Sequence, residues 1–293
     1  MPTPDWLAEQ FEQHRTHLRA VAYRMLGSAS EADDAVQESW IRLGRTDVSD
    51  VENLRAWLTT VVSRVCLDML RARTSRREDS LDTHVPDPVI TSADRDPESD
   101  AMLADSVGLA LLVVLETLEP AERLAFVLHD VFGMTFDEIA PIVGRSPVAA
   151  RQLASRARRR VQSKAPSSEP DLRQQRRVLD AFLAAVRDGD FERLVTVLDP
   201  DIVLRADGGA LAGASRFVRG PHAVAAQAAT FSRLGLSSQL VLVNGNLGFV
   251  SRRPDGRLFA VLGFTVASGK IVEIDILADP ERLSRLDLSA IES

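Results

Sequence analysis

The first part of the chain carries apolar residues at helical spacing. One helical pattern ends at Leu26, the next follows a helix cap expected at Ser30, and a third starts near Asn53. Because the three patterns are separated only by short polar breaks, residues 1–75 are predicted to form an all-α domain.

Two segments without this periodicity separate the remaining parts of the chain. Residues 76–101 are rich in Pro, Asp and Ser and are predicted to be an acidic linker. Helical spacing returns near Met102, which predicts a second all-α domain over residues 102–164. Residues 165–172 contain Pro and Ser again and are predicted to be a second linker.

The pattern changes after this second linker. An amphipathic helix is predicted from Arg173 to Arg187, and apolar segments separated by Gly-containing turns then predict strands. These strand segments are 240–243, 247–251, 258–266 and 271–277. In the last one, Glu273 and Asp275 alternate with apolar residues and are expected to face solvent. Helices followed by an antiparallel sheet predict an α+β domain over residues 173–293.

A helix-turn-helix is predicted within the second helical domain. Gly144 allows a tight turn, and Ser146-Pro147 suits the N-cap and first position of a basic helix with a small-residue buried face. Outward residues near the start of such a helix reach base edges, and later arginines meet phosphates. The predicted DNA contacts are Ser146, Arg151, Gln152, Ser155, Arg158 and Arg159. The alternative is a solvated basic helix end.

Composition and charge narrow the classes of function. The 293 residues suffice for two or three domains, and the formal net charge of -7 argues against a protein that coats DNA by itself. The segment from Arg145 to Lys164 nevertheless contains no acidic residue, which favours a local DNA contact.

The content of cysteine, histidine and apolar residues narrows the classes of function further. The single cysteine, Cys66, excludes an internal disulfide and a thiolate metal cluster, and the five histidines are scattered, so no metal or cofactor is expected. No apolar run approaches the ~20 residues of a membrane span and the N-terminus does not resemble a signal peptide, so a cytoplasmic protein is expected.

Two blocks of sequence resemble one known family. Tyr23–Gly27, Glu31–Leu43 and Asn53–Leu58 resemble region 2 of extracytoplasmic-function (ECF) sigma factors, and Leu118–Arg123 with the helix-turn-helix resembles region 4. The resemblance covers roughly the first 165 residues. It implies a non-enzymatic subunit that binds RNA polymerase core and promoter DNA and directs promoter-specific initiation.

The resemblance also implies roles for exposed residues of region 2. The residues implied to contact polymerase core are Asp34, Gln37, Glu38 and Ile41. Those implied to contact the melted -10 element are Arg64, Asp68 and Arg71. The alternatives are an ordinary wet helix face for the first group and a surface Arg64–Asp68 ion pair for the second.

The C-terminal part resembles the SnoaL-like, or ketosteroid-isomerase-like, α+β cone that some ECF sigma factors carry. The resemblance rests on three short motifs, Pro86–Val89, Asp207–Gly209 and Asp279–Leu283, although Ala210 and Leu211 depart from the second motif. It implies that the domain modulates the sigma factor by touching the linker or region 2. The residues expected to make this contact are Pro86, Asp87, Pro88, Asp207, Gly208, Gly209 and Asp279.

Two other functions remain as alternatives. The chain could be a small-molecule-responsive transcription regulator, with a ligand in the cone as a candidate partner, or a SnoaL-like isomerase or cyclase fused to a DNA-binding arm. Acid–base chemistry would need Asp207, His222, Glu273 or Asp275. Because these residues suggest no convincing acid–base pair, regulation is favoured over catalysis.

Overall fold

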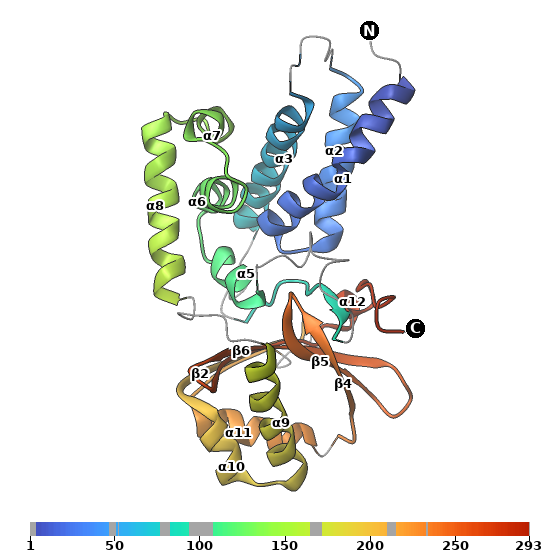
Figure 1. Ribbon diagram of the computed structural model, residues 1–293, viewed down its shortest axis with the longest axis vertical. Helices are drawn as coiled ribbons and strands as arrows, with labels where there is room; N and C mark the ends of the chain where they lie inside the picture. Colours follow the sequence, from blue (N-terminus) through green and yellow to red (C-terminus); the bar gives the residue numbers. More distant parts are fainter. Residues whose placement is uncertain are drawn as a thin grey trace. The chain divides into compact units, whose positions relative to one another are not determined.

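Figure 1 shows the computed structural model of the chain. The structure describes residues 4–46, 51, 53–76, 83–93, 108–164, 172–209, 215–232 and 234–292. The chain divides into two compact units: Met1–Asp79 with Val114–Lys164, and Ser80–Val113 with Ala165–Ser293. The predicted helix start near Met102, most of the linker's acidic residues, and Ala210 and Leu211 lie outside the described residues.

The first unit begins with three packed helices, α1 (Pro4–Leu26), α2 (Ala29–Leu43) and α3 (Leu54–Arg76). Their contact is apolar and includes the fully buried Leu18, Met25 and Leu58. The expected cap at Ser30 is wrong, since Ser28 has extended backbone and its Oγ accepts a hydrogen bond from the Glu31 amide.

The same unit contains the predicted helix-turn-helix. The elements there are α6 (Pro120–Phe126), the π-helical turn η1 (Val127–Val131), α7 (Phe136–Val143) and α8 (Pro147–Lys164). A reciprocal capping box between Thr135 and Glu138 starts α7, and Gly144 ends it with a φ of 69°. The buried Ala150, Ala154 and Ala157 of α8 allow close approach of α6 and α7. A further helix, α5 (Leu109–Glu116), spans the boundary between the two units.

The second unit is built on a seven-stranded sheet with strand order β1-β4-β5-β6-β7-β2-β3. The strands are β1 (Ile90–Ser92), β2 (Leu198–Asp207), β3 (Arg216–Arg219), β4 (Ser237–Val243), β5 (Asn246–Arg252), β6 (Leu258–Ala267) and β7 (Lys270–Leu277). The antiparallel prediction is wrong for one pair, because β2 runs parallel to β7. The linker prediction also missed β1, which pairs antiparallel with β4.

Both faces of this sheet are covered. The helices α9 (Leu172–Asp188), α10 (Phe191–Val197) and α11 (Pro221–Ser232) gather on one face (Figure 1), over a core that includes Phe182 and Phe264. On the other face, Val85 and Ile90 of the linker join Leu109 and Leu283 in a second apolar cluster. The predicted α+β cone is therefore confirmed, with the linker as part of its fold.

The expectation that Glu273 and Asp275 face solvent is wrong. Asp275 is only 2% exposed, and both carboxylates pair with Arg205 of β2. Alternation places both residues correctly on one face of β7. The neighbouring strand β2 and the second apolar cluster bury that face of the sheet. Within the described part of the chain, no helix is long and apolar enough to span a membrane.

Candidate functional site

The residues expected to bind polymerase core form an open surface on α2. Asp34 and Gln37 are exposed, and Ile41 is 41% exposed despite its apolar side chain. Glu38 Oε1 accepts a hydrogen bond of 2.9 Å from Arg42 Nε, so its position on this face is held by an i,i+4 ion pair. An exposed apolar residue beside acidic groups suits a protein partner.

The residues expected to contact the -10 element lie on α3. Arg64, Asp68 and Arg71 are all exposed. The ion pair in this group joins Asp68 to Arg71, with 4.0 Å between Oδ1 and Nη1, and not Asp68 to Arg64 as the sequence suggested. A surface pair at this distance contributes little to stability, which leaves both arginines accessible to DNA.

The residues expected to contact the -35 element follow one exposed face of α8. Ser146 Oγ accepts a hydrogen bond of 3.3 Å from the Ala149 amide and thereby caps this helix. Arg151, Gln152, Ser155 and Arg159 are exposed, and Arg158 is partly buried. The Arg151 guanidinium lies 5.3 Å from the centre of the Phe136 ring, and Arg158 donates to Asp130 of η1.

Sequence reasoning missed Val148 on the same helix. The residue is 68% exposed, which is unusual for an apolar residue. It lies three and four positions before Arg151 and Gln152, so the three share one helix face. The spacing alone could have identified it. An apolar side chain at this place could contact a thymine methyl group in a major groove.

The helices on the two sides of the linker pack together inside the first unit. Arg123 of α6 donates to the Arg24 carbonyl at 3.3 Å, and the His17 and Phe132 ring centres are 5.4 Å apart. Burial, with the charges of Arg55, His14 and Arg24, lowers the pKa of His17 to about 4. A neutral His17 is therefore favoured within this contact at neutral pH.

A second site joins the linker to the C-terminal domain. We name the contact of Val85 and Asp87 with Asp207 and Arg282 the linker clasp. Arg282 donates to Asp87 Oδ1 through Nε at 2.7 Å, to Asp207 Oδ2 through Nη1 at 2.7 Å, and to the Val85 carbonyl at 2.6 Å. One guanidinium thus connects two segments of the second unit.

Asp207 is the anionic centre of the linker clasp. Its Oδ2 accepts a hydrogen bond of 3.1 Å from the Val85 amide and lies 3.1 Å from His84 Nδ1. Burial alone would raise the pKa of Asp207, but these hydrogen bonds, the Arg282 charge and the Gly209 amide lower it to about 2. The carboxylate is therefore ionised at neutral pH.

Asp279 and Gly209 fix the position of Arg282. Asp279 Oδ1 accepts a hydrogen bond of 2.9 Å from the Glu281 amide and caps the short helix α12 (Pro280–Leu283), which carries Arg282. Gly209 has a φ of 69°, and a Cβ atom there would come within 2.3 Å of Asp279 Oδ2. A side chain at Gly209 would therefore disturb the clasp.

The structure brings most of the expected regulatory residues together. Asp87, Asp207, Gly209 and Asp279 meet as described above, and Pro86 and Pro88 are buried beside Asp87. The Gly208 amide instead donates to Ser215 Oγ at 3.2 Å.

Asn244 provides a second attachment of the linker that the sequence prediction missed. Its Oδ1 accepts a hydrogen bond from the Val89 amide at 3.1 Å, and its own amide donates to the Val89 carbonyl at 2.9 Å. Asn244 and Gly245 have φ angles of 51° and 80° in the turn between β4 and β5. The Asn-Gly pair is the sequence signal that could have found this turn.

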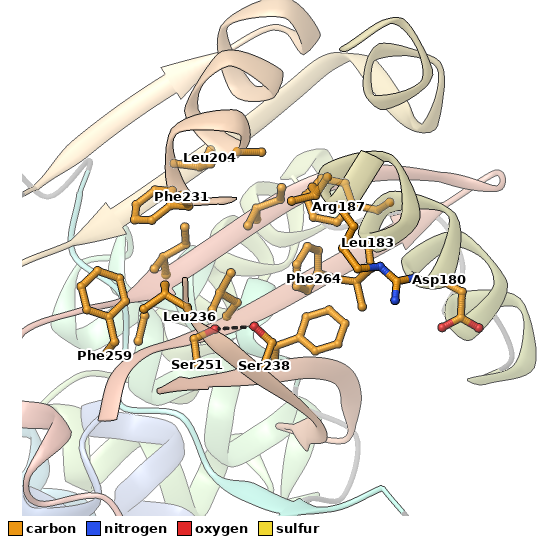
Figure 2. Close-up of a pocket in the computed structure, with 18 residues that line it drawn as sticks. Asp180, Leu183, Arg187, Leu204, Phe231, Leu236, Ser238, Ser251, Phe259 and Phe264 are labelled. Atoms are coloured by element: carbon orange, nitrogen blue, oxygen red, sulfur yellow. Dashed lines mark hydrogen bonds between the residues drawn. The ribbon is translucent and has the colours of Figure 1, made fainter. Parts of the chain in front are cut away.

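The candidate acid–base residues are held apart from the cavity of the cone. This cavity, about 710 Å³ in volume, lies between the helices and the sheet (Figure 2), and its lining includes none of Asp207, His222, Glu273 and Asp275. His222 is exposed on α11. Burial outweighs the effect of Arg205 and raises the pKa of Asp275 to about 6.

Comparisons with known proteins identify the family of the two helical regions. The Sigma-70 region 2 family model matches residues 10–76, and the Sigma-70 region 4 family model matches residues 108–161. Two such blocks in this order define a transcription initiation factor of the sigma class.

Relatives cover nearly the whole chain. The ECF RNA polymerase sigma factor SigJ of Mycobacterium tuberculosis is 40% identical over 290 residues, which are 94% of this chain and 92% of SigJ. A probable ECF RNA polymerase sigma factor of the same species, SigI, is 36% identical over 98% of each chain. The crystal structure of M. tuberculosis SigJ matches with a TM-score of 0.74 and 35% identity, covering 96% of this chain and 99% of that one. The chain belongs to the ECF RNA polymerase sigma factors, which direct promoter-specific transcription initiation.

Proposed function

We propose that this sigma factor is modulated intramolecularly by its C-terminal domain, which holds the linker between regions 2 and 4. The observation that carries the proposal is the linker clasp, in which Arg282 binds Asp87, Asp207 and the Val85 carbonyl. The pairing of β1 with β4 adds a second attachment of the same linker.

The promoter-reading surfaces are proposed from their exposure and chemistry. The α2 face with Ile41 binds polymerase core, and the α3 face with Arg64 and Arg71 binds the melted -10 strand. Single-stranded DNA is bound by cations and stacking more than by duplex readout, which suits exposed arginines. On α8, Arg151 and Gln152 read base edges, while Arg158 and Arg159 contact phosphates.

The physical basis of regulation is the reach of the linker. An extended chain spans at most roughly 3.5 Å per residue, so fixing residues 83–93 to another domain limits the separations that regions 2 and 4 can adopt. Polymerase and promoter require one particular separation of these regions. The clasped and released linkers therefore form a two-state equilibrium, which sets the active fraction of the protein.

The first unit supports an additional restraint on free protein. Regions 2 and 4 pack together through Arg24, Arg123 and the His17–Phe132 contact. Specific promoter binding then requires polymerase core to separate them, and the free chain binds promoter DNA weakly.

Catalysis by the cone is not favoured. Asp207 is ionised inside the clasp, and Asp275 and Glu273 are paired with Arg205 outside the cavity lining. A general acid or base must reach a bound substrate, which these groups do not do from their positions.

The test is run-off transcription with purified core polymerase and a library of promoters. Arg282→Ala removes the centre of the clasp and is expected to change transcript yield several-fold, while co-elution with core persists. Arg285→Ala is the matched control, since Arg285 is an exposed neighbour that pairs with Glu281 at 2.7 Å. Equal transcription by the wild type and both variants at every promoter would contradict the proposal.

A further inference from the structure

The cone contains a cavity large enough for a small organic molecule. Its volume of about 710 Å³ lies within the ~300–1,000 Å³ range of ligand sites. Figure 2 shows Phe231, Phe259 and Phe264 around this space, with Leu183 of α9 and Leu204 of β2 completing the apolar wall.

The cavity wall contains few hydrogen-bonding groups, and two of them lie side by side. Ser238 of β4 and Ser251 of β5 face each other with 3.0 Å between their hydroxyl oxygens. The charged groups of the lining, Asp180 and Arg187, belong to exposed residues of α9 and have opposite signs. The wall therefore offers an apolar surface, one pair of hydroxyls and no net charge.

We infer that this cavity binds a neutral, largely apolar molecule that carries one hydrogen-bonding oxygen. The aromatic walls would enclose the apolar body, and a hydroxyl of the Ser238–Ser251 pair would donate to the oxygen. A carboxylate or ammonium ligand is disfavoured, because the charged groups of the lining belong to exposed residues and the rest of the wall offers a buried charge only two hydroxyls.

The strands that line the cavity also hold the linker. On β5, Phe249 and Ser251 line the cavity, whereas Val250 between them belongs to the opposite cluster with Val85 and Ile90. Neighbouring residues of a strand point to opposite faces, so displacement of a lining residue moves the linker side as well.

The linker clasp lies at the ends of two of these strands. Leu204 lines the cavity three positions before Asp207, and Ile276 lines it on the paired strand. The Ala278 amide then donates to the Asp207 carbonyl at 2.7 Å. A bound ligand therefore biases the clasp, which extends the regulation proposed above and rests on it.

Ligand binding is tested on the full-length protein with prodan, a neutral naphthyl ketone whose fluorescence reports apolar surroundings and hydrogen bonding to its carbonyl. Ala228 lines the cavity from α11, and Ala226 is exposed on the same helix outside the lining. Ala228→Trp is expected to weaken prodan binding at least about tenfold by filling the cavity, and Ala226→Trp to leave it unchanged. Ser251→Ala keeps the shape and is expected to weaken binding about fivefold through loss of one hydrogen bond.

Coupling is measured as amide hydrogen exchange at Val85 and Val89, whose amides bond Asp207 and Asn244. Saturating prodan is expected to change both exchange rates at least about threefold in the wild type and Ala226→Trp. Absence of prodan binding to the wild type would overturn the proposed site. The same conclusion would follow if a folded Ala228→Trp variant and the Ser251→Ala variant both bound prodan with wild-type affinity. Binding without any change in exchange would overturn the coupling. Neither result affects the Arg282→Ala transcription test, which concerns the clasp alone.

Discussion

The arginines of α8 and the arginine of the linker clasp use the same side chain in opposite surroundings. Arg151 and Arg159 are exposed on a helix face. Arg282 is mostly buried and binds two carboxylates and a carbonyl. Exposed guanidinium groups stay available for phosphates and bases, whereas a buried one with all its partners inside the chain fixes a tertiary contact.

The two regions therefore depend on the sequence in different ways. The α8 face is local, because its cap, turn and arginines lie within one stretch of chain. The clasp is non-local, because Arg282 and Asp87 are 195 positions apart. We therefore expect substitutions in the clasp to affect folding and linker position, and substitutions on α8 to affect DNA binding.

The largest expected effect separates the two regions by stability. Arg282→Ala removes the guanidinium that Asp87 and Asp207 share and is expected to cost about 3 kcal/mol of unfolding free energy. Arg158→Ala removes a partly exposed pair with Asp130 and is expected to cost less than about 1 kcal/mol. Urea unfolding of the second unit measures the free energy lost in Arg282→Ala, and urea unfolding of the first unit measures the free energy lost in Arg158→Ala. Equal losses of unfolding free energy in the two variants would show that the clasp arginine is no more important to stability than the α8 arginine.

The second prediction concerns the pH dependence of the clasp. The folded pKa of Asp207 is about 2, below its ordinary value of 3.8. The ionised carboxylate therefore contributes its full stabilisation above about pH 4, and this contribution, about 2 kcal/mol, is lost as the pH falls towards 2. Unfolding of the wild type and Asp207→Asn should be compared across this window. If the unfolding free energies of the two proteins changed with pH in parallel, the clasp would not stabilise the ionised Asp207 carboxylate.

The third prediction divides the α8 face by role. Arg151→Ala is expected to change the base preference at one -35 position by about 2 kcal/mol. Arg158→Ala should instead weaken binding to all sequences and lower the salt slope by about one. The holoenzyme's affinity for promoter variants at several salt concentrations measures both quantities. Identical profiles for the two variants would count against this division.

The smallest expected effect concerns Val148. If this side chain contacts a thymine methyl group, replacing that thymine by uracil should weaken wild-type holoenzyme binding by about 0.8 kcal/mol, the value of one buried methyl-sized group. Val148→Ala should bind the thymine and uracil duplexes equally. A uracil effect of the same size in both proteins would place the methyl contact elsewhere.

Local signals explain how much could be predicted from the sequence. Gly144 and Ser146 indicate the turn and cap of the helix-turn-helix directly, and apolar segments between turn signals located β4 to β7 to within a few residues. The exposure of Arg151 and Ile41 follows from helical periodicity in the same way. Each of these features is decided by residues close together in the chain.

The missed features depend on distant partners. The strand β2 escaped prediction because its first residues, with Pro200 and two aspartates, hide its alternation, and its parallel pairing with β7 has no local signature. Alternation placed Asp275 on a face but could not say that Arg205 and an apolar cluster cover it. Arg282 was part of a quoted motif, yet only the folded chain shows which carboxylates it joins.

A double-mutant cycle on transcription in the full-length chain tests whether the C-terminal domain acts by holding the linker. Run-off yield with core polymerase is measured for the wild type, Asp87→Ala, Arg282→Ala and the double variant. If the C-terminal domain acts by holding the linker, Asp87→Ala changes the yield in the same direction as Arg282→Ala, and the double variant matches Arg282→Ala alone. Independent, multiplicative effects of the two substitutions, or no effect of either, would contradict the account.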